Sequence, residues 1–445
     1  MAPAKSNPLG YAALAVSAAA YAALAYATPR TSFAQLLLLY AVVFVAYLYV
    51  TNQRFSLRHG MAAALLFRCI FLFATPALSD DYFRFVWDGR LLAAGVNPYL
   101  YLPEFLMQPE APQVPGITQE LFAQLNSQSY YSVYPPVSQA VFWLAAQLSP
   151  QSIQGSVVVM RLILLLAEAG SILLLWRLLR KMGLPEKHVL LYALNPLVII
   201  ELVGNLHFEA LMIFFLLLAL YQLFYHRLVW SGFAFGLAIG TKLLPLMFLP
   251  FLLRKLGLRQ FILYGSVVLI TVMAQFAPLV NLQLLHNILQ SLDLYLTRFE
   301  FNASIYYLLR WLGFRLMGYN TIAILGPLLS LATLVVILSM ASVKKLGSVR
   351  RLAGYMAAAL TVYLLLSTTV HPWYLTTLLA LTVMSHFRFA ITWSGLAILT
   401  YAAYRTPTYQ EDTLLLALEY ILVFMWLGVE VYLYRQRRRH ANLNG

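Results

Sequence analysis

The chain has 445 residues, of which 62% are hydrophobic and only 10% are charged. Soluble globular proteins carry about 25% charged residues, so this composition excludes an ordinary soluble domain. The net charge of +14 lies in short basic clusters between apolar runs. That is the positive-inside pattern of membrane proteins, and it argues against a nucleic-acid-binding surface.

The apolar runs indicate the fold class. Runs of roughly 17–25 residues, enough to cross a bilayer as helices, recur along the whole chain. They lack the alternating polarity of the strands of a membrane barrel. The sequence therefore predicts one all-α polytopic transmembrane domain over residues 1–445, with about 12–14 membrane helices. The only cysteine, Cys69, excludes an internal disulfide.

The chain begins with a predicted helix pair, 9–28 and 33–51, within residues 1–60. A third span, 61–78, runs outward and leads into the longest stretch outside the membrane, 79–156. Within that stretch, residues 136–149 are apolar but too short to cross, which predicts a half-helix or an interfacial helix.

The rest of the chain continues the bundle. Two short apolar helices, 229–241 and 244–253, form a hairpin from the basic side, and residues 280–318 form a second outer loop. This layout places both termini and the basic loops in the cytoplasm and most acids outside. The remaining spans are predicted at 157–178, 188–204, 210–225, 257–279, 319–341, 352–370, 375–388, 390–404 and 412–434.

Two adjacent acids, Asp80 and Asp81, follow the third span. A carboxylate where membrane meets water can accept a proton from a hydroxyl when it is ionised and aimed at it. Both cannot point at one atom, so one is predicted to be the base and the other to support it. An Asp80–Arg84 ion pair would hold Arg84. The alternative is that Ser79 and Asp80 cap a helix, a role from which Asp81 gains less.

The residues after these acids predict a helix with one polar face. Asp81, Arg84 and Asp88 share that face at i, i+3 and i+7. Arginine forks match phosphate oxygens, so Arg84, Arg90 and Asp88 are candidates to bind a phosphate or a sugar. The alternative is an internal Arg84–Asp88 pair that holds the helix.

His371 lies where a predicted span ends on the outer face. A histidine there can hold a leaving phosphate or carry a proton. Trp373 and Tyr374 are candidates for substrate contact, although an interfacial aromatic belt uses the same residue types. Tyr134 and Asn302 lie in two stretches that we expect to shape the site and touch the substrate.

Lys242 lies at the apex of the predicted hairpin. Broken helices at membrane depth are tolerated where they line a cavity, and a cation there suits a lipid phosphate. The alternative is that Lys242 snorkels to the interface. His207 and Glu209 form a weaker outward cluster, and no second histidine pair completes a metal site around them.

Two arginines, Arg68 and Arg161, are predicted inside spans. A cation in the membrane needs a partner, because an unpaired charge there is costly. Glu168, seven residues further along the same span as Arg161, is the predicted partner for that arginine.

Several motifs resemble the GT-C superfamily of membrane glycosyltransferases, which use polyprenyl-phosphate sugars. Within it, they resemble bacterial polyprenyl-phosphate-mannose-type mannosyltransferases and the eukaryotic relatives that build the glycolipid anchor. The resemblance begins near residue 61, after two extra spans at 9–51. It rests on Asp80-Asp81, Phe85-Val86-Trp87-Asp88-Gly89-Arg90, Gly95-Val96-Asn97-Pro98-Tyr99, Tyr134-Pro135-Pro136, Lys242-Leu243-Leu244-Pro245-Leu246, Asn302 to Tyr306 and His371-Pro372-Trp373-Tyr374.

The resemblance implies a GT-C-like bundle and an inverting sugar transfer on the outer face of a bacterial inner membrane. The donor would be a polyprenyl-phosphate sugar, with mannose favoured, and the acceptor a lipid or glycan hydroxyl. The catalytic acid would fall on Asp81 or Asp80, with Asp81 preferred because Arg84 follows it by three positions. Arg84, His371 and Lys242 would hold the donor phosphate.

The same resemblance makes Asn97 and Tyr99 candidates for substrate binding. No nucleotide or other cofactor is required for such a transfer, and a divalent metal is possible but not indicated. Two alternatives stay open at this point: a lipid or glycan transporter, and a glycan polymerase or ligase that uses a diphosphate-linked donor.

Overall fold

A computed structural model describes residues 7–342, 346–406 and 408–443 of the chain. Over these residues the regular structure is helical, apart from one isolated bridge between Phe301 and Thr369. The prediction of an all-α fold is confirmed. The longer helices are α1 Pro8–Tyr26, α2 Phe33–Asn52, α3 Leu57–Ile70, α4 Asp81–Ala93, α6 Pro136–Leu148, α7 Ile153–Lys181, α10 Glu209–Phe224, α11 Leu228–Thr241, α13 Leu258–Phe276, α14 Leu284–Thr297, α15 Ile305–Met317, α16 Ile322–Ser342, α17 Val349–Leu366 and α20 Thr413–Leu443.

Short helices join these elements. They include a π-helix, η3, which is followed by Asn205 and then by Leu206 with a left-handed backbone (φ 62°). The short helices are η1 Phe105–Met107, α5 Gln119–Ala123, η2 Glu186–His188, α8 Val189–Ala193, α9 Pro196–Val198, η3 Ile199–Gly204, η4 Leu244–Phe248, α12 Leu249–Leu256, η5 Ala277–Leu279, η6 Pro372–Tyr374, α18 Leu375–Thr382, α19 Phe389–Leu396 and η7 Ala397–Tyr404.

Seven helices in the described part of the chain are long and apolar enough to cross a membrane, or eight if the bent pair 186–204 is one span. The chain is therefore a multi-pass membrane protein. Two expected spans, at 210–225 and 390–404, are shorter apolar helices, and the helix expected at 229–241 is short, as predicted. The expected span at 61–78 ends as a helix at Ile70, because the chain turns there and Pro76 cannot continue a helix.

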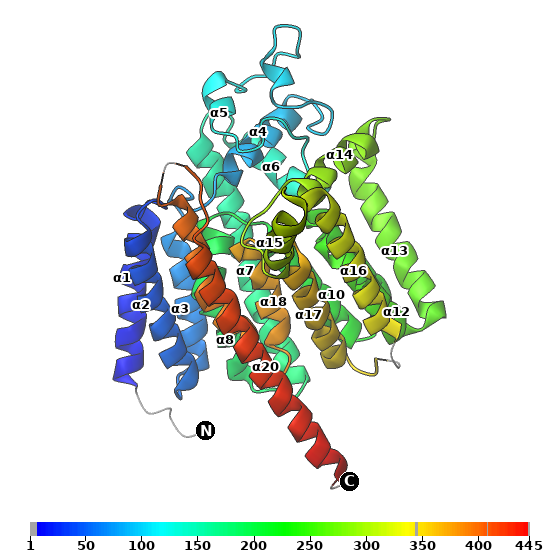
Figure 1. Ribbon diagram of the computed structural model, residues 1–445. Coiled ribbons are helices and arrows are strands. Elements are labelled where there is room, and N and C mark those ends of the chain that lie inside the picture. Colours follow the sequence, from blue (N-terminus) through cyan, green and yellow to red (C-terminus); the bar gives the residue numbers. More distant parts are fainter. Residues whose placement is uncertain (1–6, 343–345, 407, 444–445) are drawn as a thin grey trace.

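The two ends of the bundle differ in character. In Figure 1, α4, α5 and α6 lie at the end opposite both termini, and α1 and α2 lie together at one side of the bundle, beside α3. Helices α2, α7 and α12 end on the side of the termini, where basic residues gather in their last turns or just after them. The predicted separation of acidic outer motifs from basic loops thus has a structural counterpart.

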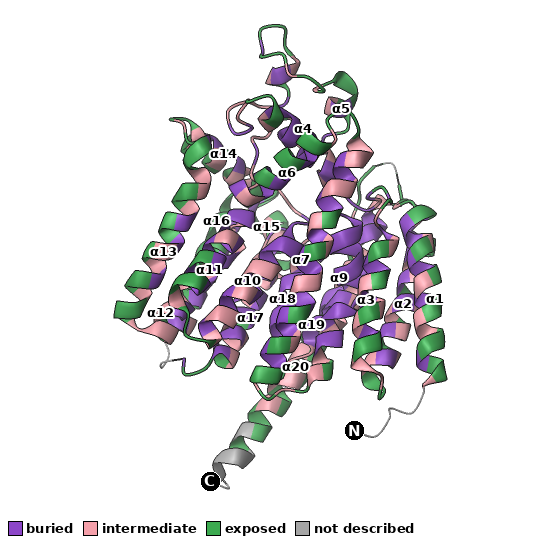
Figure 2. Ribbon diagram, turned by 180° about the vertical axis from the view of Figure 1, so that it is seen from behind, coloured by how far each residue is buried: buried purple, intermediate pink, exposed green. Residues whose placement is uncertain are grey.

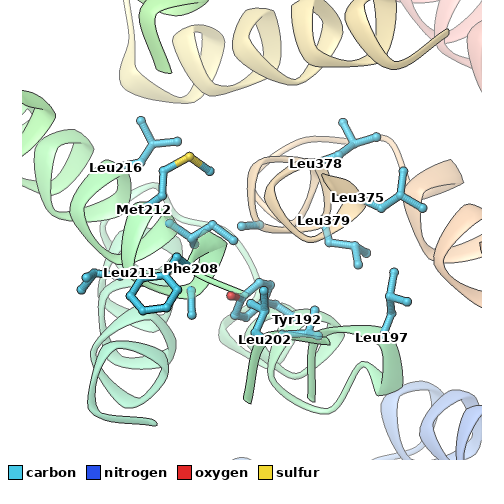
Figure 3. Packing of buried hydrophobic residues seen from close by; sticks show 14 of the residues in the cluster. Tyr192, Leu197, Leu202, Phe208, Leu211, Met212, Leu216, Leu375, Leu378 and Leu379 are labelled. Carbon is cyan, nitrogen blue, oxygen red and sulfur yellow. The ribbon is translucent and has the colours of Figure 1, made fainter. Parts of the chain in front are cut away.

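The core lies inside the bundle, where α10, η3 and α18 meet. Figure 3 shows Leu202, Phe208, Met212 and Leu379 packed there with other apolar side chains. Many apolar residues on the outer helices are exposed instead, as the green surface positions of Figure 2 show. That distribution suits a protein whose outer surface contacts lipid.

Helices α4 and α6 pack unusually closely. A side chain at Gly89 would meet the carbonyl oxygen of Phe142 at 2.3 Å. Phe85 stacks on Phe142 with ring centroids 4.7 Å apart. Glycine at position 89 therefore lets the two helices touch, and α4 takes its orientation from α6.

The two arginines that were predicted inside spans, Arg68 and Arg161, are buried, and their donors are satisfied in different ways. Arg68 donates to Glu168 Oε2 through Nη2 at 2.8 Å, and Tyr192 donates to the other oxygen of Glu168 at 2.7 Å. The predicted Arg161–Glu168 pair is therefore wrong. Arg161 donates to four backbone carbonyls, those of Leu72, Ala74, Val203 and Gly204, at 2.5–3.0 Å. The planar guanidinium of Arg161 donates to two chain segments at once. Glu168, on the same helix, pairs with Arg68 instead.

We expect Glu168→Ala to destabilise the protein strongly, because it leaves the buried Arg68 guanidinium unpaired. The expected loss is about 3–5 kcal/mol. Thermal unfolding of the purified protein in detergent measures it. The matched control is Arg180→Ala, which breaks the exposed Arg180–Glu186 pair and should cost less than about 1 kcal/mol. Equal effects of the two changes would contradict this account.

Candidate active site

Helix α4 begins with the two acids, and they have different partners. Asp80 forms an ion pair with Arg30 from the loop between α1 and α2, with Arg30 Nη1 2.7 Å from Asp80 Oδ2. The predicted Asp80–Arg84 pair is wrong, since Arg84 pairs with Asp88 instead. Asp80 is the residue before the helix, but its side chain makes no capping hydrogen bond.

Asp81, the first residue of α4, is half-buried at the end of the bundle opposite the termini, which we call the outer end. Its Oδ1 accepts a hydrogen bond of 2.8 Å from the Asn126 side chain. Burial, and then the negative charge of Asp81, raise the pKa of Tyr134 and that of Tyr295 (to about 12). Burial also raises the pKa of Tyr374, where Asp81 contributes less than Tyr363, Tyr295 and Glu209. Asp81 therefore lies among aromatic hydroxyls from three other segments of the chain.

Further along α4, Arg84 and Asp88 form a buried pair at 2.8 Å, as the structural alternative predicted. Arg84 also donates to the carbonyls of Ser127 and Tyr130. Asp88 is fully buried and accepts from Ser132 and Gln139 as well. These contacts favour a structural role, in which the pair holds the loop before α6.

Arg90 is buried too, and its Nη1 donates to the carbonyl of Gly116 at 2.6 Å. Asn97 and Tyr99 tie the outer loop to its neighbours, because Asn97 donates to the carbonyl of Leu279 and Tyr99 to that of Tyr134. These three residues, predicted to bind substrate, have protein partners that account for their positions.

Lys242 ends α11 and reaches the same region as Asp81. Its Nζ lies 2.9 Å from Glu209 Oε1 at the start of α10, and 5.8 Å from the centre of the Tyr134 ring. The Lys242 side chain is 25% exposed. Glu209 Oε2 is buried and has no hydrogen-bond partner among the described residues. The apex of the hairpin thus brings a cation beside a tyrosine that the charge of Asp81 also reaches.

Three rings stack next to this pair. The His207 ring lies 3.6 Å from the Trp373 ring, and Trp373 lies 4.3 Å from His371 and nearly parallel to it. Tyr374 meets His371 edge-on. His207 Nε2 lies 3.3 Å from Glu201 Oε2, but it is not aligned for a hydrogen bond. The stack fixes the orientation of both imidazoles.

His371 is neutral at physiological pH. Burial, and then the neighbouring His207 and Lys242, lower its pKa to about 3. The segment that carries it is held by the second outer loop, because Val370 N donates to the carbonyl of Phe301 at 2.8 Å. A neutral imidazole can donate one hydrogen bond and accept another.

Asn302 anchors that loop. It has a left-handed backbone (φ 46°), its N–H donates to Glu411 and its carbonyl accepts from Tyr420 on α20. These bonds account for its position without a substrate.

The structure thus brings together eight of the predicted site residues at the outer end of the bundle. We call them the outer cluster: Asp81, Tyr134, His207, Glu209, Lys242, His371, Trp373 and Tyr374. All come from the ends of helices or from loops. Among the described residues, no group of three metal-binding side chains has the geometry to hold a metal.

Sequence reasoning missed three residues near the outer cluster: Arg30, Asn126 and Glu201. Glu201 is an acid inside an apolar run, and such a residue is a functional candidate by default. Arg30 is a cation in an outer loop, against the positive-inside trend. Asn126 gave no signal in the sequence, because a lone polar residue in an outer loop is ordinary.

The chain matches a known protein family. The model described as "Alpha-(1->6)-mannopyranosyltransferase, N-terminal domain" matches residues 4–256, more than half of the chain. The match starts at residue 4, so it includes the first helix pair, which the sequence resemblance left out. A search of curated proteins finds no match.

We expect His371 to make the protein less stable as the pH falls. Its pKa of about 3 in the folded protein lies below the usual value of 6.5, so its contribution is present above pH 6.5 and is lost as the pH falls toward 3. The loss is at most about 1.4 kcal/mol per pH unit. Melting temperatures between pH 7 and 4 should fall less for His371→Gln than for the wild type. His286→Gln, at an exposed position on α14, is the control, and an unchanged slope in His371→Gln would refute the prediction.

Proposed function

Because the chain belongs to the alpha-(1->6)-mannopyranosyltransferase family, and is thus a GT-C type mannosyltransferase, we propose that it transfers mannose from a polyprenyl-phosphate donor to a lipid or glycan hydroxyl. We place the reaction on the outer face of a bacterial inner membrane, with both termini in the cytoplasm. The observation that carries the proposal is the outer cluster, in which the acid Asp81, the cation Lys242 and the neutral His371 lie on neighbouring segments around Tyr134 and Tyr374.

The donor class is supported by the position of Lys242. A polyprenyl phosphate keeps its chain in the bilayer and its phosphate near the interface. Lys242 tops a membrane hairpin, where its ammonium is in reach of such a phosphate. His371 can donate a hydrogen bond from the N–H of its neutral imidazole. Such a donor stabilises the negative charge that develops on the leaving phosphate.

The base is Asp81 in this proposal, because Asp80 is paired with Arg30, whereas the charge of Asp81 acts on Tyr134 and Tyr374 of the outer cluster. Asp81 takes the proton of the acceptor hydroxyl as its oxygen attacks the anomeric carbon. The bond from that carbon to the phosphate oxygen breaks, and its electrons leave with polyprenyl phosphate. A single displacement inverts the centre, so an α-linked product requires a β-linked donor.

The aromatic residues complete the site. Trp373 is buried and stacks on both histidines, so it orients them. Tyr374 is half-buried and meets His371 edge-on, so it is the ring of this segment that can contact a sugar. Arg84, Asp88 and Arg90 hold the outer loop and its neighbours, and Asn97, Tyr99 and Asn302 hold the surrounding segments. We therefore assign these six a supporting role.

We expect Asp81→Asn to lower mannosyl transfer by at least about 100-fold, since it removes the base. Asp80→Asn should keep transfer within about tenfold, because a partly exposed ion pair contributes no more than about 1 kcal/mol. The assay is release of polyprenyl phosphate from polyprenyl-phosphate mannose by purified protein in nanodiscs. Full activity of Asp81→Asn would exclude it as the base.

Loss of the Lys242 charge should weaken the hold on the donor. We expect Lys242→Gln to lower kcat/KM for the donor by about 10–100-fold, as for other charged hydrogen bonds. Because this change leaves Glu209 without its cation, the double variant Lys242→Gln/Glu209→Gln separates charge loss from misfolding and should stay impaired. The control is the exposed Lys187→Gln. Donor kinetics unchanged in both Lys242 variants would remove Lys242 from the site.

A further inference from the structure

The loop between α1 and α2 reaches the start of α4. Arg30, in that loop, pairs with Asp80 at 2.7 Å, and its guanidinium also lies 4.9 Å from the ring centre of Tyr404 in η7. The two side chains are 30% and 37% exposed, so the pair is at the edge of the site and not inside the core. Arg30 therefore has two contacts that fix where its charge lies.

The first helix pair is held firmly against the rest of the bundle. Tyr26 donates to the carbonyl of Ile70 at 2.8 Å, Tyr40 to that of Ser394 at 2.6 Å, and Tyr47 to that of Leu191 at 2.9 Å. These bonds reach three different segments. The loop that carries Arg30 is also closed by Gln35, which donates to the carbonyl of Ala27. The position of Arg30 is thus set by the fold.

The electrostatic problem at this point is the adjacency of Asp80 and Asp81. Two neighbouring carboxylates repel, and each makes ionisation of the other less favourable. A carboxylate base must be ionised to accept a proton. An unpaired negative charge on Asp80 would therefore make the ionised form of Asp81 less favourable. A cation paired with Asp80 removes that penalty.

We propose that Arg30 is a positioning residue for the sugar transfer: it holds the Asp80 carboxylate away from Asp81 and cancels its charge, so that Asp81 acts as a single ionised base. The inference rests on the proposed function. It gives the first helix pair a part in the chemistry, although no residue of that pair belongs to the outer cluster.

Other groups also act near Asp81, and the test must leave them unchanged. Asn126 donates to it, and Arg84 lies on the same helix. The remaining titratable groups within its electrostatic reach are Tyr134 before α6, Tyr295 on α14, Tyr374 in η6 and Tyr404 in η7. Of these six residues, Tyr404 is the one whose ring contacts Arg30.

The experiment is a charge cycle on the full-length protein in nanodiscs, with transfer from polyprenyl-phosphate mannose measured from pH 4 to 8. Arg30→Gln should move the acidic limb of the pH–kcat profile to higher pH by roughly half to one unit. Arg30→Lys should keep the wild-type limb. Arg30→Gln/Asp80→Asn should restore it, because the uncompensated charge is gone.

The position of the acidic limb separates this role from a structural one, since a damaged fold would lower kcat at every pH without moving the limb. Arg315→Gln, which removes an exposed charge on α15, should leave the limb in place. An unshifted limb in Arg30→Gln, or a shift that the double variant keeps, would overturn the inference while leaving Asp81 as the base. Failure of the wild type to use polyprenyl-phosphate mannose would instead overturn the proposed function.

Discussion

The outer end of the molecule depends on the hydrogen bonds that the Arg161 guanidinium donates to four backbone carbonyls. A charge inside a bundle needs all its donors satisfied, and Arg161 meets this need with carbonyls from the turn after α3 and from the end of η3. Both segments lead directly into the site: one continues to α4, and the other to His207. Asn205 joins them a second time, because its side chain accepts from Leu78 N. One buried cation thus fixes the relative position of Asp81 and the ring stack.

Helix ends, and not helix faces, supply the outer cluster. Lys242 ends α11, Glu209 begins α10 and Asp81 begins α4. The sides of the long helices contact lipid or the core, while the functional residues lie at the helix ends. The π-helix η3 and the left-handed Leu206 directly before His207 show that the backbone itself is adjusted here, as is common where function sets the geometry.

Much of this organisation was predictable from the sequence, for reasons that differ from residue to residue. Hydropathy and the basic loops predicted the helical bundle and its two unlike ends, because the membrane restricts the choices so strongly. The Arg84–Asp88 pair was foreseeable because its spacing is local. The partners of Arg161 and Asp80 were not, since a carbonyl fork and an arginine fifty positions away leave no periodic signal. For the same reason, sequence alone did not separate Asp88, Arg90 and Asn97 from the residues of the outer cluster.

The contact at Gly89 has a practical consequence. Because the Phe142 carbonyl occupies the space where a side chain would grow, even one added methyl group acts as a wedge between two elements that have no room to adjust. The displacement would be passed along α4 to its first residue, Asp81. Position 89 is therefore a natural place to build a temperature-sensitive allele, in which chemistry fails through misalignment while the chain still inserts.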